Sequence, residues 1–250
     1  MKLARYTHKG HIHYGVLEGD VLHELMRTPF SGIERQGSTC GLDEIELLPP
    51  VFPQKIVAVG LNYRDHAQEF GLDLPDEPVL FMKPPSALLA HGGEIIYPPM
   101  SERVDYEAEL VLVCGKECRN IEPQDAASYV LGYTCGNDVT ARDLQIKDGQ
   151  WTRAKSFDTF CPLGPFIETL IDPGDLAIEL RLNGETRQSS NTSNMAFSPA
   201  DLLSFVSRIM TFYPGDVIMT GTPSGVGEMQ PGDTVEVVIA GLGTLRNTVA

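Results

Sequence analysis

The sequence predicts a β-rich α+β protein. The first observation is that Pro-Gly-Asp occurs three times, beginning at Pro173, Pro214 and Pro231, and that a strand-like run follows each occurrence. Proline sets φ at the second position of a type II turn and glycine supplies the positive φ of the third. The second observation is that strand patterns fill most of the chain, whereas helical periodicity is confined to two or three segments.

The chain divides near residue 50. It has 250 residues, a length typical of one domain with a small appendage. The stretch HIHYGVLEGDVLHELM predicts two short strands around a Gly-Asp turn, and LLPPVFP follows as a proline-rich connector. We therefore expect a small N-terminal β-rich module at residues 1–50 and a larger domain at residues 51–250.

Strands and hairpins dominate the larger domain. The run VDYEAELVLV at 104–113 predicts a strand that is buried on both faces. The run at 176–182 alternates leucine and isoleucine with other residues and then meets Asn183-Gly184, a strong hairpin signal. Residues 234–249 predict a closing hairpin.

Two segments carry helix signals. The stretch SPADLLSFVSRIMTFY places Ser198 at the N-cap, Pro199 at the first helical position and Asp201 at the third, ahead of an apolar stripe. The stretch EPQDAASYVLGYT at 122–134 is a shorter second candidate.

Composition narrows the class of partner and the compartment. The net charge of −15 argues against nucleic acid and against an anionic membrane, and it favours a bound cation. We find no apolar signal-peptide region and no apolar run near the roughly 18 residues of a membrane span. Five cysteines without C-x-x-C spacing are expected to be reduced in a cytoplasmic protein, with a zinc pair at Cys114 and Cys118 as the alternative.

Two carboxylates on the strand at 104–113 are the first candidate site. Because side chains alternate along a strand, Glu107 and Glu109 point the same way. Two like charges in a partly dry place repel each other unless a cation intervenes, and a divalent metal accepts such oxygen ligands. The alternative is a strand whose polar face begins outside the core.

The stretch GNDVTARDLQIK offers a third carboxylate. Asp138, Arg142 and Gln145 fall at i, i+4 and i+7, which is one face of a helix. In one interpretation Asp138 is a metal ligand at a helix start, and Arg142 and Gln145 hold a substrate carboxylate or carbonyl. In the other, Asp138 is an N-cap and Arg142 makes a surface ion pair with it.

A histidine and a glutamate form a candidate general base. His66 and Glu69 stand at i, i+3 in LNYRDHAQEFG, close enough on a helical turn for the carboxylate to orient the imidazole. A surface His–Glu pair is the alternative. We assign no role to the other histidines.

The segment at 62–78 is expected to close as a lid over the ligand. It is polar, and Gly71 and Pro75 interrupt it.

Two further segments offer groups for an anionic substrate. Lys155 stands among aromatic and apolar residues, where a partly desolvated lysine stabilises an enolate or oxyanion; a snorkelling surface lysine is the alternative. The Gly-rich loop MTGTPSGVG at 219–227 follows an apolar strand, and its N–H groups and the Thr222 hydroxyl can cradle a carboxylate. No Gly-Lys-Ser/Thr follows it, so it is not a P-loop.

The order of these motifs resembles the fumarylacetoacetate hydrolase family over about residues 53–250. The resemblance implies a mixed β-roll catalytic domain, a homodimer, and a Mg²⁺ or Mn²⁺ ion. The short N-terminal module has no counterpart of the fourth carboxylate ligand of the long eukaryotic hydrolase. The implied residues are Glu107, Glu109 and Asp138 for the metal, His66, Glu69 and Lys155 for catalysis, and Arg142, Gln145 and Thr222 for the substrate.

The resemblance also implies the reaction. A small acylpyruvate-like oxo acid is the expected substrate, cleaved at a C–C bond by a water that His66 activates. Decarboxylation of a small oxo-di- or tricarboxylate and isomerisation of a 2-hydroxy-dienedioate are the alternatives within the family. A catalytically silent metal-binding module is the alternative from another class, and the intact His66, Glu69 and Lys155 argue against it.

Overall fold

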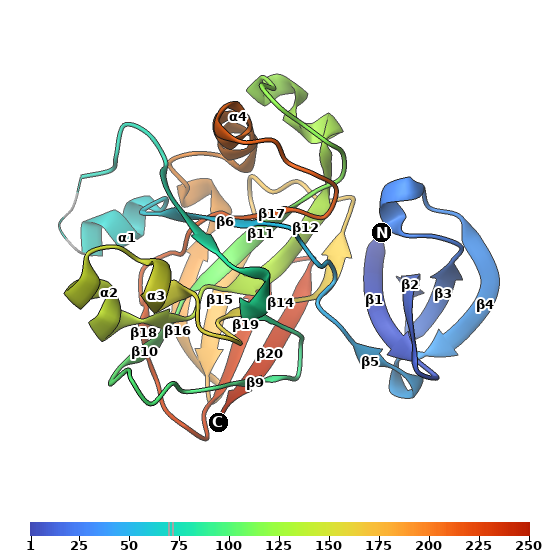
Figure 1. Cartoon of the computed structure of the whole chain (residues 1–250), viewed down its shortest axis with the longest axis horizontal. Coiled ribbons are helices and arrows are strands. Elements are labelled where there is room, and N and C mark those ends of the chain that lie inside the picture. The colour runs from blue at the N-terminus through green and yellow to red at the C-terminus, as the bar shows by residue number, and fades with distance from the viewer. Residues whose placement is uncertain (70, 72) are drawn as a thin grey trace.

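The computed structural model describes residues 1–69, 71 and 73–250 and is β-rich, as the sequence predicts (Figure 1). The largest sheet runs in the order β4-β3-β2-β1-β14-β12-β11-β17-β6-β7, with β5 paired to β1 and β8 paired to β14. Its strands are β1 (Lys2–His8), β2 (His11–Glu18), β3 (Val21–Leu25), β4 (Arg35–Gly41), β5 (Glu46–Leu47), β6 (Ile56–Gly60), β7 (Val79–Lys83), β8 (Leu88–Leu89), β11 (Ala108–Cys114), β12 (Val130–Asn137), β14 (Cys161–Glu168) and β17 (Val217–Met219).

Two smaller sheets complete the β structure. One has the order β13-β10-β18 and the other β16-β15-β19-β20-β9. The hairpins predicted after residue 176 and at 234–249 are both present in the second of these sheets. The strands are β9 (Glu94–Ile95), β10 (Val104–Tyr106), β13 (Thr140–Ala141), β15 (Ala177–Leu182), β16 (Glu185–Asn191), β18 (Gly227–Met229), β19 (Thr234–Ile239) and β20 (Gly243–Val249).

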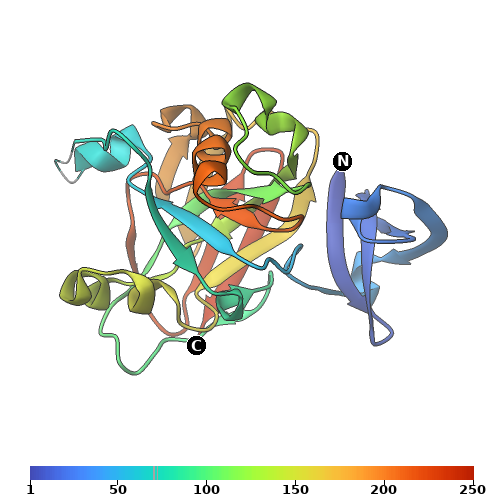
Figure 2. The ribbon, with the colours of Figure 1, turned by 45° about the horizontal axis from the view of Figure 1, so that its top comes forward.

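The helices are short and lie outside the sheets (Figure 2). Within the described residues, no helix has the length and apolarity needed to cross a bilayer. The α-helices are α1 (Arg64–Glu69), α2 (Arg142–Asp148), α3 (Thr152–Lys155) and α4 (Pro199–Ile209), and the 3₁₀ turns are η1 (Pro29–Ser31), η2 (Leu42–Glu44), η3 (Pro85–Ala87), η4 (Pro123–Ser128) and η5 (Thr192–Asn194).

The first fifty residues contribute β1 to β5 and stand to one side of the rest (Figure 1). The predicted pair of strands around the Gly-Asp turn is confirmed as β2 and β3. The sheet nevertheless continues into the larger part of the chain, since Lys2 and Leu3 of β1 pair with Glu168 and Ile167 of β14. An independent N-terminal module therefore stays a prediction.

The strand predicted at 104–113 is interrupted at Glu107, which corrects the expectation of one continuous strand. Its first part, β10, pairs with β13 and β18, whereas its second part, β11, pairs with β12 and β17. At the break, the Glu107 N–H donates to Asn137 Oδ1 and the Ala108 N–H donates to Gln188 Oε1, both at 2.9 Å. Side-chain acceptors thus replace ladder partners at the corner between two sheets.

Helix α4 has the predicted start. The Ser198 side chain accepts from the Asp201 N–H, and the Asp201 carboxylate accepts from the Ser198 N–H, which is a capping box. Its apolar stripe packs on β6, β11 and β17 as one buried cluster. The prediction of a second α-helix at 122–134 is wrong. The first half of this segment forms the 3₁₀ turn η4, and the second half is the start of β12. The β-branched and aromatic residues there pair with β11 instead.

All five cysteines are buried and their thiols are free. Cys114 Sγ and Cys118 Sγ lie 3.9 Å apart. Both side chains belong to the cluster under α4 and act there as small apolar groups.

Ser198→Ala is expected to lower the free energy of unfolding by about 1 kcal/mol, because it removes the cap of α4. Urea unfolding followed by circular dichroism measures this difference. The control is Ser31→Ala at the exposed end of η1, which is expected to change stability by less than about 0.5 kcal/mol. Equal stability of the two variants would show that the cap does not stabilise α4.

Candidate active site

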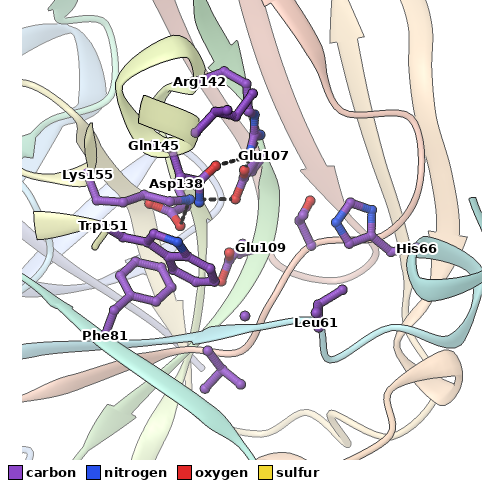
Figure 3. Close-up of a pocket in the computed structure, with 14 residues that line it drawn as sticks. Leu61, His66, Phe81, Glu107, Glu109, Asp138, Arg142, Gln145, Trp151 and Lys155 are labelled. Carbon is purple, nitrogen blue, oxygen red and sulfur yellow. Dashed lines mark hydrogen bonds and ion pairs between the residues drawn. The ribbon is translucent and has the colours of Figure 1, made fainter. Parts of the chain in front are cut away.

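One pocket of about 310 Å³ gathers most of the residues singled out from the sequence (Figure 3). Nine residues were predicted to hold the metal, to act in catalysis or to contact the substrate. Eight of them line this pocket, and Glu69 is the one that does not. The lining consists of Val59, Gly60, Leu61, His66, Phe81, Glu107, Glu109, Asp138, Arg142, Gln145, Ile146, Trp151, Lys155 and Thr222.

Three buried carboxylates form the centre of the pocket. Glu107, Glu109 and Asp138 each offer an oxygen, and these oxygens lie within 4.8 Å of one another. Pairing of β11 with β12 explains the meeting, because Ala108 stands opposite Asn137 and the Asp138 N–H then donates to the Glu107 carbonyl at 2.9 Å. The alternative of a polar face that begins outside the core is wrong for Glu107 and Glu109, which are 6% and 1% exposed.

Asp138 reaches the site from the short connection after β12 and not from a helix, which corrects the prediction of a helix start. Helix α2 begins at Arg142 and its N-cap is Ala141, so Asp138 lies between β12 and β13. Asp138 is therefore not an N-cap. The i+4 spacing to Arg142 places no ion pair between them either, because Arg142 pairs with Asp105 and Glu107.

Three cations surround the carboxylates. The Lys155 Nζ donates to Glu107 Oε2 at 2.9 Å and to Asp138 Oδ2 at 2.6 Å. The Lys83 Nζ donates to the other Asp138 oxygen and, at 3.1 Å, to the Val139 carbonyl. Arg142 contacts Glu107 from the opposite side (Figure 3). A snorkelling surface position is wrong for Lys155, which is 2% exposed.

These contacts shift the pKa values in the site. Burial alone would raise the pKa of Glu107, but Lys155 and Arg142 beside it hold that pKa far below its usual range. Burial opposes the charge of Lys155, yet Asp138 and Glu107 raise its pKa above the ordinary value. Both groups are therefore charged at neutral pH.

Glu109 has less of this compensation. Its carboxylate accepts from the Gly221 N–H at 2.8 Å, and no ion pair reaches it among the residues that the structure describes. Burial, followed by the negative charges of Asp138 and Glu107, raises the pKa of Glu109 well above its usual range. A cation bound beside Glu109 would offset this repulsion between the carboxylates. Three buried oxygen donors of this kind suit Mg²⁺ or Mn²⁺ and not zinc on thiolates.

The histidine pair is placed by helix α1. His66 Nδ1 lies 3.4 Å from Glu69 Oε2, so the predicted i, i+3 contact is confirmed. The Asp65 carboxylate accepts from the His66 N–H at 2.8 Å, and the Gly225 N–H donates to Glu69 at 3.1 Å. Helix α1 opens the predicted lid segment at 62–78, of which residues 70 and 72 lie outside the described residues. Closure of that segment stays a prediction.

The residues expected to contact the substrate are committed to other bonds. The Arg142 guanidinium reaches Glu107, Asp105 and the Gln145 amide oxygen. Thr222 Oγ1 accepts from Gln188 Nε2 at 2.9 Å. All three side chains face the pocket, and their contact with a substrate stays a prediction.

Sequence reasoning missed three polar residues of the site. Asp105 continues the alternation of Glu107 and Glu109 toward the N-terminus, so that pattern could have revealed it. Lys83 ends an apolar strand before two prolines, and a lysine at such a place is a weak signal. Gln188 belongs to no motif and is found only through the pairing of β16.

An aromatic wall closes one side of the pocket. The rings of Phe81 and Trp151 meet edge to face with centroids 5.2 Å apart, and Lys155 Nζ lies 5.0 Å from the Phe81 centroid. A Cβ at position 60 would lie 2.8 Å from the Trp151 ring, so Gly60 is required for this packing. In Figure 3, Trp151 and Phe81 lie on the far side of Glu109 from His66.

Comparison with known proteins identifies the class that this fold and site define. Residues 55–250 match the family described as fumarylacetoacetate (FAA) hydrolase C-terminal, and residues 1–50 match the Rv2993c-like N-terminal family. The protein belongs to the fumarylacetoacetate hydrolase family, and its fold is of that family's type.

Three of the similar proteins are named for an activity on a small oxo acid or a related compound. The crystal structure of 5-carboxymethyl-2-hydroxymuconate delta-isomerase from Mycobacterium smegmatis has a TM-score of 0.95 and 42% identity, covering 100% of this chain and 99% of that chain. Human mitochondrial oxaloacetate tautomerase FAHD2B is 46% identical over 82% of this chain and 70% of its own length. The crystal structure of fumarylpyruvate hydrolase from Pseudomonas aeruginosa, solved with Mn²⁺ and pyruvate, has a TM-score of 0.75 and 37% identity. The match covers 81% of this chain and 91% of that chain.

Glu109→Gln is expected to weaken Mn²⁺ binding at least about tenfold, since even a residue behind a metal ligand typically contributes that much. Isothermal titration of metal-stripped protein with Mn²⁺ and with Mg²⁺ measures the change. Glu117→Gln is the matched control, because it removes the same charge from an exposed side chain beyond the far end of β11. Unchanged affinity of Glu109→Gln, or tight stoichiometric zinc on cysteines, would contradict the assignment of the metal ligands.

Proposed function

We propose that this protein is a Mg²⁺- or Mn²⁺-dependent hydrolase that cleaves a C–C bond in a small diketo acid of the acylpyruvate type. The observation that supports it most is Glu109, a buried carboxylate with a raised pKa beside two other carboxylates. The Mn²⁺ and pyruvate held by fumarylpyruvate hydrolase support the same combination of cation and product.

Glu107, Glu109 and Asp138 are the proposed ligands of the ion. When bound there, a divalent cation supplies Lewis-acid chemistry and a template for the carboxylate and 2-oxo group of the substrate. An all-oxygen set of three carboxylates is suited to both Mg²⁺ and Mn²⁺.

His66 is the proposed general base. Glu69 lies 3.4 Å from its Nδ1 and orients the ring, and the imidazole is proposed to take a proton from water. That water attacks the distal carbonyl of the substrate. Gly225 fixes Glu69 in turn, so the orientation of the imidazole depends on the Gly-rich loop.

Lys155 is proposed to stabilise negative charge on the substrate. Two of its three N–H groups bond to Glu107 and Asp138, which leaves the third for an oxyanion or for the enolate of pyruvate. Its burial strengthens such a bond, because little water competes in the site.

Proton transfer on a small oxo acid is the second candidate function. Two of the relatives named above are an isomerase and a tautomerase, at 42% and 46% identity. Isomerisation and tautomerisation need a proton carrier such as His66 and no attacking water. Decarboxylation of oxaloacetate belongs with them, since it needs only a sink for the electrons.

His66→Ala is expected to lower kcat for hydrolysis of an acylpyruvate by about 10²–10⁴-fold, because the reaction loses its base. Oxaloacetate decarboxylation, which requires no activated water, is expected to fall much less. Glu109→Ala is expected to lower both. Loss of acylpyruvate absorbance, release of pyruvate and the enol–keto change of oxaloacetate are followed separately.

His11→Ala, an exposed histidine on β2, is the matched control and is expected to keep full activity. If His66→Ala keeps more than about a tenth of the acylpyruvate activity, the proposed mechanism is wrong. If the unmodified protein interconverts the tautomers of oxaloacetate and leaves acylpyruvates intact, the second candidate function replaces the first.

A further inference from the structure

A buried glutamine behind the pocket joins two parts of the site. Gln188 lies on β16, is 0% exposed and is not among the residues that line the pocket. Its Oε1 accepts from the Ala108 N–H at 2.9 Å. Its Nε2 donates to Thr222 Oγ1 and to the Pro223 carbonyl, each at 2.9 Å.

The bond from the Ala108 N–H to Gln188 fixes the segment that carries Glu107 and Glu109. Ala108 stands between Glu107 and Glu109, at the place where β10 ends and β11 begins. Because the chain changes sheets there, Gln188 supplies the acceptor that the Ala108 N–H needs in the buried interior. Losing that bond would free the short segment that spaces the two glutamates.

The other bonds fix the Gly-rich loop. Thr222 and Pro223 bond to the same amide nitrogen, so the loop is held at a set distance from Ala108. The loop also packs tightly on β16, since a Cβ at Gly225, where φ is +91°, would lie 2.3 Å from the Arg187 carbonyl. A single side chain therefore spans the gap between the carboxylates and the loop.

The same strand also reaches the helix that carries His66. Ser190, two residues after Gln188, donates from its hydroxyl to the Asp65 carboxylate. The other oxygen of Asp65 accepts from the His66 N–H. Strand β16 thus contacts the segment that carries Glu107 and Glu109, the Gly-rich loop and α1, which are far apart in sequence.

We propose that Gln188 is a positioning residue that sets the spacing between the Gly-rich loop and the segment that carries Glu107 and Glu109. It touches neither ion nor substrate and acts through Ala108 and Thr222. The inference rests on the proposed function, in which Glu107 and Glu109 hold the ion and Thr222 contacts the oxo acid. It predicts that removing the amide weakens metal binding and substrate binding together.

The test compares Gln188→Met with Asn247→Leu. Methionine has a similar length and volume but lacks the donor and the acceptor. Asn247 is a matched control because it is 2% exposed and also donates to two carbonyls, those of Ala90 and Gly93, on β20 away from the pocket. Both variants are expected to lower Tm.

Only Gln188→Met is expected to weaken Mn²⁺ binding, by about 10–100-fold in titration calorimetry, as for other residues behind metal ligands. It is also expected to raise KM for an acylpyruvate by a larger factor than it lowers kcat. If the methionine variant fails to fold, Gln188→Asn takes its place in the test. Asparagine keeps the amide but is one methylene shorter, and this variant is expected to show the same pattern.

A purely structural role would give a different result. If the Gln188 variants lower Tm while the Mn²⁺ affinity and KM stay within twofold of the unmodified protein, as expected for Asn247→Leu, the inference is overturned. If the unmodified protein acts on no oxo acid, the proposed function fails. The Mn²⁺ titration then still decides whether Gln188 positions the carboxylates.

Discussion

The mutual repulsion of three buried carboxylates governs the structure around the pocket. Glu107, Glu109 and Asp138 bring oxygens within 4.8 Å of one another. At an effective dielectric constant of about 20, each pair of such charges repels by about 3.5 kcal/mol, and the three pairs by about 10 kcal/mol. A domain is stable by only about 5–15 kcal/mol in total. The chain therefore has to bring positive charge to this place if all three are to stay ionised.

Elements far apart in the sequence supply that charge. Lys83 ends β7, Arg142 begins α2 and Lys155 ends α3, and each is paired with at least one of the carboxylates. Each of them forms an ion pair with Glu107 or Asp138, whereas the hydrogen bond that Glu109 accepts within the described part of the chain comes from the Gly221 N–H. The remaining imbalance is local and lies in a pocket where a substrate can enter. In the proposed function, a divalent cation on these oxygen ligands would supply the positive charge that Glu109 needs.

Local patterns in the sequence predicted much of the site, and long-range pairing decided the rest. The i, i+3 contact of His66 with Glu69 and the capping box of α4 depend on neighbouring residues, and both formed as predicted. The position of Asp138 depends on pairing between β11 and β12, so helical spacing gave the wrong element for it. The break at Glu107 follows from bonds to Asn137 and Gln188, which no local pattern shows. For the same reason, sequence analysis could not pair Lys83 with a carboxylate 55 positions away.

The proposed function requires one divalent cation among Glu107, Glu109 and Asp138. Diffraction from crystals grown with Mn²⁺ and recorded at the manganese absorption edge tests it most directly. We expect a single strong anomalous peak in the pocket, about 2.0–2.3 Å from one oxygen of each of these three carboxylates. We also expect Lys155 to remain beside the peak with an N–H group turned toward the pocket. No peak there at saturating Mn²⁺, or a peak held by other side chains, would contradict the proposed metal site.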